Sequence, residues 1–450
     1  MKAGTGFAAG LIAAAATATM AAQPATEPPE AQPVDAAEPE APPTVAQRPP
    51  TGWLSDPDAP AEDPFDALVS GKIHFDDRLR LELADTTGKK QSTALTNRIR
   101  LGYESKPYWG VSGFVEMENV ATPTPNDYYV PQTGDGSPDH TVIADPPGTE
   151  VNQAYGRYRR TGMLDSEMSL DIKGGRQRIK LDDDRFIGNV GWRQFEQTFD
   201  SVSVQSNLGI EKLSVFYAYV WGVQRIFGPD GPNPDSDSHL INVSYTALPE
   251  LKITPFVYLL DFEEDDPTNS VNNYGVRLTG ELWRDGGEDD VSVDYALTYA
   301  RQTDAGSNPV DFEVDFFAAE ARLARRGLGS VTAGYQLLGS DDGKVGFRFP
   351  LGTNHAFQGF ADQFLTTPAD GLQDLYIAGG LDLPWDIKSA VIYHQFWSDE
   401  GGEDLGHEID LVASKQIRPM WSVLVKAALF DGHNGQPDTT KLWVQTEVKF

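Results

Sequence analysis

The chain has 450 residues, no cysteine and a formal net charge of −31 at pH 7. Without cysteine it can form no disulfide framework, thiolate metal site or lipid anchor, and its acidity argues against binding to nucleic acid. Beyond the amino terminus there is no apolar run of about 18 residues or more, which excludes transmembrane helices. A mean hydropathy of −0.39 still allows a transmembrane β-barrel, because each strand of a barrel shows lipid only half of its residues.

The first 70 residues are predicted to lie outside the folded domain. Residues 1–22 combine Lys2, a short alanine-rich apolar stretch and small residues around Ala21, which is the pattern of a cleaved secretory signal peptide. Residues 23–70 are rich in Pro, Ala, Glu and Asp, and such a segment cannot bury enough apolar surface to offset the entropy lost on ordering. We therefore expect a disordered periplasmic tail that serves as a spacer, the alternative being a segment that binds peptidoglycan.

Residues 71–450 divide into short segments of alternating polar and apolar residues, separated by turn-forming residues. Alternation with a period of two predicts strands that have one apolar face, and an even number of strands is typical of single-chain bacterial barrels. We predict an all-β fold, a single transmembrane antiparallel β-barrel of about 18 strands. The strands are expected at residues 73–84, 94–104, 108–118, 151–160, 166–174, 198–206, 211–221, 237–246, 251–262, 272–283, 289–301, 312–324, 328–338, 373–382, 387–396, 407–415, 421–430 and 440–449.

The connections between these strands are expected to alternate between long and short. Long extracellular loops and short periplasmic turns are typical of outer-membrane barrels, whereas a soluble sandwich gives no reason for such alternation. An even number of strands then places both ends of the barrel in the periplasm. The longest connections are expected at residues 119–150, 175–197, 222–236 and 339–372.

The last segment, residues 440–450, has one apolar and one polar face. Leu442, Val444 and Val448 fall on the apolar side, and the chain ends on Phe450. The segment resembles the last strand of bacterial outer-membrane barrels, in which the terminal aromatic residue is part of the signal read by the barrel assembly machinery. The alternative is a half-buried strand at the end of a soluble sandwich.

Strand parity assigns arginines to the inside of the barrel. The apolar residues of the first two predicted strands face lipid, so their arginines face inward. A hairpin centred near Lys89 would place Arg78 opposite Arg100 and Arg80 opposite Arg98. Because like charges directly across a ladder are destabilising, we expect water, acidic partners or a ligand to compensate them.

The residues expected to line the pore form a basic wall and an acidic wall. Two such walls would produce a transverse field that orients charged solutes, and patterns of charge set selectivity in pores. The alternative is that these side chains pair with one another and with loops folded into the lumen. The residues assigned from the strands are Arg78, Arg80, Arg98, Arg100, Arg157, Arg159, Glu116, Glu118, Asp294, Glu313 and Asp315.

One long connection, residues 352–376, carries three phenylalanines among small and polar residues. We expect it to form a plug or a constriction, and the alternative is an extracellular lid that packs on the rim. Its candidate lining residues are His355, Phe357, Phe360, Asp362 and Phe364.

Distinctive motifs occur along nearly all of residues 71–450. They include R-I-R-L-G-Y at 98–103, A-D-P-P-G-T-E-V-N-Q-A-Y at 144–155, G-R-Q-R-I-K-L-D-D-D-R-F-I-G-N-V-G-W-R-Q at 175–194 and H-E-I-D-L at 407–411. In these motifs the chain resembles the alginate export porins, a family of eighteen-stranded outer-membrane barrels. The resemblance implies a porin of the outer membrane of a Gram-negative-type bacterium, with an arginine-rich lumen that suits an anionic uronate polymer.

The resemblance also adds Arg176 and Arg193 to the expected pore lining, because both fall within the matching motifs. Strand parity places Arg176 on the outer face unless Gly174 and Gly175 form a bulge. The chain departs from the family's strongly positive lumen in being markedly acidic after the tail.

No nucleophile elbow, phosphate-binding loop or zinc-binding spacing occurs in the sequence. We therefore expect no catalytic residue, no metal site and no cofactor, and a passive channel for small or oligomeric hydrophilic solutes, with anionic saccharides as candidates. The expected partners are outer-membrane lipid and lipopolysaccharide, the barrel assembly machinery through Phe450, and a hydrophilic solute, but not nucleic acid. The alternatives are an outer-membrane enzyme with an active site at the barrel rim and a structural envelope protein with a plugged barrel.

Overall fold

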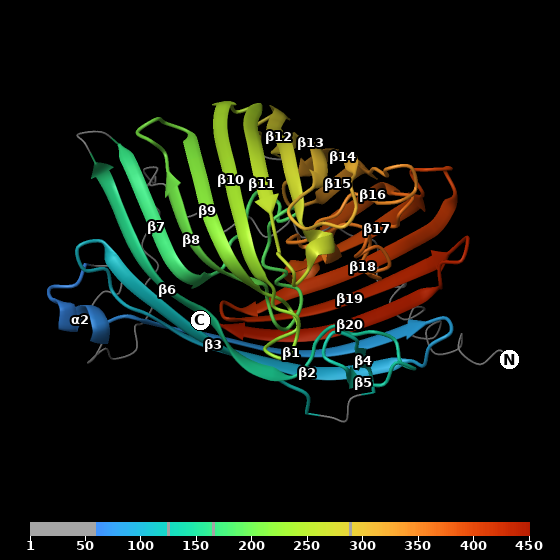
Figure 1. The fold of residues 1–450 in the computed structure, drawn as a ribbon, viewed down its shortest axis with the longest axis horizontal. Helices are drawn as coiled ribbons and strands as arrows, with labels where there is room; N and C mark the ends of the chain where they lie inside the picture. The colour runs from blue at the N-terminus through green and yellow to red at the C-terminus, as the bar shows by residue number, and fades with distance from the viewer. Residues whose placement is uncertain (1–59, 124–126, 164–166, 288–289) are drawn as a thin grey trace.

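Eighteen strands form one closed antiparallel sheet in the computed structural model (Figure 1), which describes residues 60–123, 127–163, 167–287 and 290–450. Consecutive strands pair with each other, and the barrel closes where β1 pairs with β20. The predicted all-β barrel of about 18 strands is therefore confirmed. The predicted signal peptide, residues 1–22, and most of the predicted tail lie outside the described residues.

Each predicted strand overlaps one observed strand, with ends that differ by a few residues. Within the loop that follows β3, two short strands, β4 and β5, form a separate two-stranded sheet. The observed elements are β1(Lys72–Thr86), β2(Ser92–Glu104), β3(Val111–Ala121), β4(Tyr129–Val130), β5(Asp135–Gly136), β6(Gly148–Met163), β7(Met168–Gln177), β8(Thr198–Ser206), β9(Leu213–Gln224), β10(Asp235–Leu248), β11(Leu251–Leu260), β12(Val271–Arg284), β13(Val291–Asp304), β14(Glu313–Arg325), β15(Gly329–Leu338), β16(Leu372–Leu383), β17(Ile387–Trp397), β18(Asp404–Arg418), β19(Trp421–Gly432) and β20(Thr439–Lys449), with 3-10 turns η1(Pro267–Asn269), η2(Asn354–Ala356) and η3(Pro384–Asp386).

The end of the predicted tail forms a short helix just before the first barrel strand. Helix α2(Pro64–Val69) begins after Asp63, whose side chain accepts hydrogen bonds from the backbone N–H groups of Phe65 and Asp66. The helix is tied to the barrel because Tyr103 Oη donates to the Leu68 carbonyl oxygen at 2.6 Å. Among the described residues, no helix is long and apolar enough to cross a membrane.

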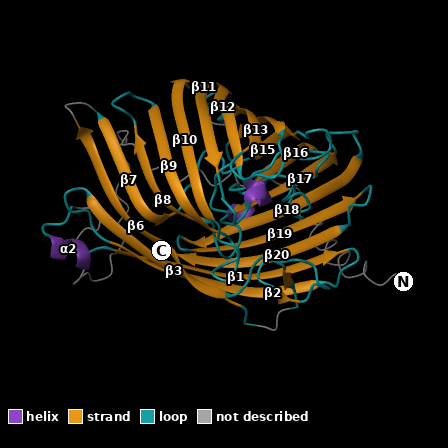
Figure 2. Cartoon of the chain, in the orientation of Figure 1, coloured by secondary structure: helices purple, strands orange, loops and turns teal. Residues whose placement is uncertain are grey.

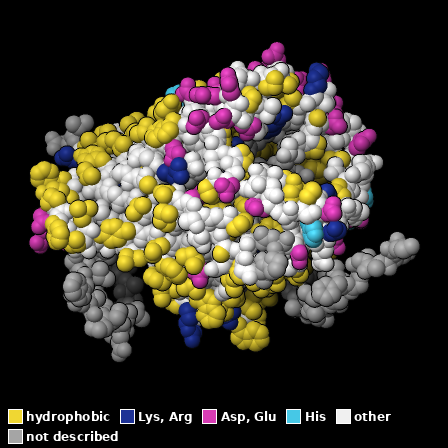
Figure 3. All heavy atoms as spheres, turned by 60° about the horizontal axis from the view of Figure 1, so that its bottom comes forward, with side chains coloured by type: hydrophobic (Ala, Val, Ile, Leu, Met, Phe, Trp, Pro, Cys, Tyr) yellow, Lys and Arg dark blue, Asp and Glu magenta, His cyan; other side chains and the backbone are white. Residues whose placement is uncertain are grey.

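Apolar side chains cover the outside of the barrel. Leu101, Ile377 and Val444 are 56 %, 53 % and 46 % exposed, whereas their strand neighbours Arg100 and Trp443 are buried. Figure 3 shows hydrophobic side chains over much of the visible outer wall, with acidic side chains gathered along one edge. This two-sided pattern is the one that an outer-membrane-type barrel requires.

The carboxy-terminal strand closes the barrel with its polar face inward, as its alternation predicts. Lys441 and Trp443 are buried inside, and Val444 is exposed outside. Phe450 exchanges backbone hydrogen bonds of 2.9 Å with Phe75, and the two rings lie 5.2 Å apart. The last residue of the chain is therefore held directly against β1.

Candidate pore constriction

Two long loops fold into the lumen of the barrel, where Figure 2 shows them inside the ring of strands. They are residues 178–197, between β7 and β8, and residues 339–371, between β15 and β16. Their main chains meet at a bridge between Ile187 and Leu351, and the Gly188 N–H donates to the Leu351 carbonyl oxygen at 2.9 Å. Together they narrow the lumen of the barrel. Residues 352–364 therefore lie inside the barrel and do not form the external lid that was the alternative prediction.

The four arginines of the first hairpin lie on its inward face, but in a different register from the predicted one. Arg78 pairs with Arg98, and Arg100 pairs with Asp76. The hairpin is centred on Gly88 rather than Lys89, and moving the centre by one residue shifts every cross-strand pair by two. One arginine of β2 therefore faces a carboxylate instead of another arginine.

All four guanidinium groups are largely buried, and each is paired with a carboxylate. Arg80 and Arg98 have fully buried side chains, and the charges are compensated inside the protein rather than by open water. The alternative in which the charges pair among themselves and with inward loops therefore describes this wall. The pairs are Arg78–Glu447 at 3.0 Å, Arg80–Asp145 at 3.4 Å, Arg98–Asp76 at 2.5 Å and Arg100–Glu118 at 2.5 Å.

The arginine wall also forms the seat of the first inward loop. Arg78 Nη1 donates to the carbonyl oxygen of Gly191 at 3.0 Å, and Arg80 Nη2 donates to that of Trp192 at 2.5 Å. The Arg80 guanidinium lies 4.1 Å from the centre of the Trp192 ring, within the range of a cation–π contact. These arginines therefore hold the loop against β1 and β20.

Two further predicted lining residues that face inward, Arg157 and Asp294, also have charged partners. Arg157 pairs with Asp171, and Asp294 lies 3.6 Å from Arg322. Glu116 and Glu118 are buried on β3. Arg159 is exposed beside the turn between β2 and β3, where its backbone N–H donates to the Gly110 carbonyl oxygen.

Three of the predicted lining residues face outward. No bulge occurs at Gly174–Gly175, and Arg176 pairs with Asp200 on the outer face at 2.8 Å. Glu313 and Asp315 pair with Arg301 outside the barrel, at 2.6 and 2.9 Å.

Glu313 and Asp315 face outward, opposite to the prediction, because aromatic side chains fill the lumen beside β14. Phe186, Phe347 and Phe349 of the two inward loops pack there against Phe316, with ring centres 5.1 to 5.7 Å apart. Val314 and Phe316 are buried against this cluster, so the charged residues between them point outward. Apolar residues mark the lipid face of a strand only where the lumen is polar.

His355 of the second loop stands at the centre of a charged contact network. Its Nδ1 lies 2.5 Å from Asp362 Oδ1, and its Nε2 accepts a hydrogen bond from Lys426 Nζ at 2.8 Å. Arg193 of the first loop lies 2.7 Å from the same carboxyl group of Asp362. Burial lowers the pKa of His355 well below its usual value, so the ring is neutral and donates from Nδ1.

The Asp362 carboxylate is ionised in this network. Burial alone would raise its pKa, but His355, Lys441 and Arg193 hold it well below its usual value. The stacked rings of Trp192 and His355, 4.9 Å apart, join the two loops beside this carboxylate. Arg193 and Asp362 thus connect the loops to each other rather than facing an open pore.

The second loop is seated on two carboxylates of β18. Glu408 Oε1 accepts from the Ala361 N–H at 2.6 Å, and Asp410 Oδ2 accepts from the Phe360 N–H at 3.1 Å. Gly359 has a φ of +76°, and a Cβ there would lie 2.3 Å from Glu408 Oε2. Phe360 and Phe364 are buried in this seat, and Phe357 is half-buried.

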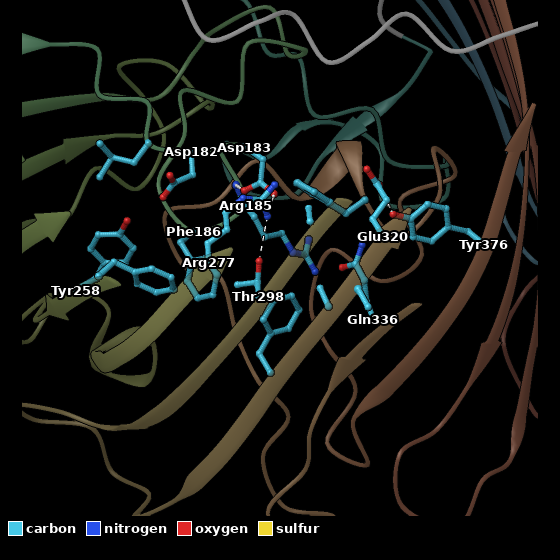
Figure 4. Close-up of a pocket in the computed structure, with 17 residues that line it drawn as sticks. Asp182, Asp183, Arg185, Phe186, Tyr258, Arg277, Thr298, Glu320, Gln336 and Tyr376 are labelled. Carbon is cyan, nitrogen blue, oxygen red and sulfur yellow. Dashed lines mark hydrogen bonds and ion pairs between the residues drawn. The ribbon is translucent and has the colours of Figure 1, made fainter. Parts of the chain in front are cut away.

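Beside the two loops lies a pocket of about 130 Å³, shown in Figure 4. Asp182 and Asp183 line one side of it, and Glu320 and Tyr376 line the other. Arg277 Nη1 lies 2.7 Å from Asp183 Oδ2, and Tyr376 Oη donates to Glu320 at 2.5 Å. The pocket therefore brings charges of both signs together within the barrel.

Arg185 is the one loop arginine of this pocket, and its charge is only partly compensated. Its Nη2 donates to Gln358 at 2.7 Å, and its guanidinium lies 3.8 Å from the Phe349 ring centre. Nε and Nη1 have no hydrogen-bond partner among the described residues. Burial lowers its pKa to about 9, which leaves it charged at pH 7.

The charged residues of this pocket were not singled out by the sequence. Asp182, Asp183 and Arg185 belong to the motif at 175–194, but nothing in the motif indicates that the loop turns inward. Arg277 and Glu320 could have been found by strand parity, because each lies in an alternating segment.

No family model and no curated protein matches this chain. Its fold is similar to those of several solved structures at low sequence identity. Acinetobacter baumannii OccAB4 has a TM-score of 0.61 and 13 % identity, over 86 % of this chain and 100 % of that one. Pseudomonas aeruginosa OccK9 (OpdG) has a TM-score of 0.62 and 12 % identity, over 84 % and 98 % of the two chains.

The outer membrane protein OprD from Pseudomonas aeruginosa is also similar, with a TM-score of 0.58 and 15 % identity over 84 % of this chain and 94 % of that one. At these identities the likeness establishes the fold, an eighteen-stranded barrel of the outer-membrane kind.

Proposed function

We propose that this protein is an outer-membrane porin of a Gram-negative-type bacterium, a passive channel for hydrophilic solutes. The observation that carries the proposal is the barrel's combination of an apolar outer wall with a lumen narrowed by two loops to a charged pocket. A narrow, water-accessible passage lined by fixed charges is how pores select solutes. The fold shared with OprD supports the same function.

The charges of the pocket favour small solutes that are charged or strongly dipolar. Asp182, Asp183 and Glu320 provide negative charge, and Arg185 and Arg277 provide positive charge, within one pocket. Arg185 lines this pocket, and its Nε and Nη1 are buried donors that no described residue satisfies; an oxygen-rich solute that enters the pocket would supply the missing acceptors. Anionic saccharides, which the resemblance to alginate export porins implies, are one such class.

The burial of the four hairpin arginines changes the basis of this selectivity. Because their guanidinium groups are paired and covered by the first loop, they contribute little to the field that a passing solute meets. We propose instead that Arg185 and Arg277 provide the anion contacts. The envelope partners, lipopolysaccharide around the barrel and the barrel assembly machinery at Phe450, remain part of this proposal.

The test is the single-channel conductance and reversal potential of the refolded protein in a planar bilayer under a salt gradient. We expect open, ohmic channels. Replacing Asp183 by Asn should shift the reversal potential towards anions, and replacing Arg277 by Gln should shift it towards cations.

Arg301→Gln is the matched control, because Arg301 pairs with carboxylates on the outer face and should leave the reversal potential unchanged. A properly folded protein with no conductance would refute the channel and favour a structural envelope protein with a plugged barrel. A measurable conductance that neither pocket substitution alters would refute the pocket as the selective region.

A further inference from the structure

A cluster of three metal-ligating side chains lies at the extracellular end of the barrel, on its outer face. The ligand atoms of His407, Asp431 and His433 all lie within 4.8 Å of one another. His407 and Asp431 are cross-strand partners on β18 and β19, and His433 follows in the loop after β19. Because the neighbouring Glu408 is buried inside the barrel, strand alternation points His407 outward.

A fourth residue, Asp404, orients one of the histidines. Its Oδ2 lies 2.8 Å from His433 Nδ1, and its backbone carbonyl accepts a hydrogen bond from Asn434 at 2.8 Å. With Nδ1 donating to Asp404, the lone pair of His433 is on Nε2. A carboxylate that holds the second nitrogen of a ligating histidine is a common feature of metal sites and fixes both the tautomer and the ring orientation.

We propose that His407, Asp431 and His433 bind a divalent transition-metal ion such as Zn²⁺. Two imidazoles and one carboxylate form a donor set that suits zinc and leaves a fourth position for water or another oxygen donor. Two ligands of a tetrahedral zinc ion lie about 3.4 Å apart, so side-chain movements of about 1 Å close the cluster around the ion.

A bound ion would connect three segments of the chain. His407 is on β18, Asp431 is on β19, and His433 belongs to the loop that leads to β20. The loop is already tied to the start of β18, because the His433 N–H donates to the Leu405 carbonyl oxygen at 3.2 Å. The ion would thus fix the loop between β19 and β20 to the barrel rim, in a position independent of the inner pocket.

The test is isothermal titration of the refolded protein, carrying no histidine tag, with ZnCl₂ in detergent. We expect one ion per chain with a micromolar dissociation constant. His407→Asn and His433→Asn should each abolish this binding, and Asp404→Asn should weaken it about 10- to 100-fold through loss of orientation.

His239→Asn is the matched control, since His239 also lies on the outer face but contacts Tyr217 instead of carboxylates. It should leave zinc binding unchanged. Co²⁺ binding to the unmodified protein provides a second measurement that needs no variant, because four-coordinate Co²⁺ absorbs strongly in the visible range. Absence of stoichiometric binding below about 1 mM Zn²⁺, or equal affinity in His407→Asn, would overturn the proposal.

Discussion

Replacing Arg80 by methionine should release the first inward loop from the barrel wall. The Arg80 side chain is fully buried and contacts Trp192 twice, through a hydrogen bond of 2.5 Å to its carbonyl oxygen and through its ring at 4.1 Å. It also lies 3.4 Å from the buried Asp145. Methionine fills a similar volume but provides neither the donors nor the charge.

The magnitude follows from these contacts. A hydrogen bond from a charged group contributes about 1.5–3 kcal/mol, and a desolvated cation–π contact contributes about 2 kcal/mol. Removing one partner of a buried ion pair costs about 3–5 kcal/mol in total. If about 3 kcal/mol of this cost destabilises the inward position of the loop, the population of the released loop rises about 150-fold.

Single-channel recording measures this population as the fraction of time spent in a state of larger conductance. We expect such a state to be rare in the unmodified protein and frequent in Arg80→Met. Arg301→Met is the control, because it removes two ion pairs from the outer face, where the Arg301 side chain is 44 % exposed. A stable Arg80→Met barrel with an unchanged conductance histogram would refute the role of Arg80 as a loop anchor.

Three further predictions concern the loops and the chain end. The pKa of His355 is lowered from 6.5 in the folded state, so below pH 6.5 the unfolded chain takes up a proton that the folded chain does not, and stability falls as the pH falls. His355→Gln should therefore flatten the dependence of Tm on pH between about 6.5 and 5. An equally steep curve for this variant would contradict the prediction. Gly359→Ala should displace the second loop from Glu408 and alter conductance. Gly88→Ala is the control, because Gly88 also has positive φ but no atom lies within 4 Å of the position of its Cβ. Identical conductance in both variants would refute the role of Glu408 in holding the second loop. Phe450→Ala should lower the amount of protein in the outer membrane of cells but not its refolding in detergent, and failure of both would indicate a purely structural role.

The strands and their inward faces could be predicted from the sequence wherever one face meets lipid and the other meets polar groups. The hairpin of β1 and β2 satisfies this condition, so the inward positions of Arg80 and Arg98 follow directly from the alternation. Its register could not be predicted to the residue, because it depends on which of two adjacent turn positions lies at the centre. A turn centred on Lys89 would place Arg78 opposite Arg100, whereas the observed turn, centred on Gly88, places Asp76 there.

The candidate site was less accessible to sequence reasoning, because two loops that are distant in the sequence form it together. Nothing local to residues 178–197 indicates that Arg80 holds them inside the barrel. The same loops reverse the apparent polarity of β14, where Phe316 faces an aromatic cluster and Asp315 faces outward. Errors in the pore lining at Glu313 and Asp315 therefore have one cause, a lumen that is apolar in part.

The closure of the barrel has a consequence for how the protein folds. Asp76 pairs with Lys449, so the first and last strands meet across almost the whole folded sequence. Both inward loops rest on this seam, the first through Arg80 of β1 and the second through Lys441 of β20, whose Nζ lies 2.8 Å from Asp362. Contacts of such long sequence separation form late, because their loop-closure entropy must first be overcome. The narrowing of the lumen should therefore be the last structural step, one that begins only after the whole chain has been delivered to the membrane.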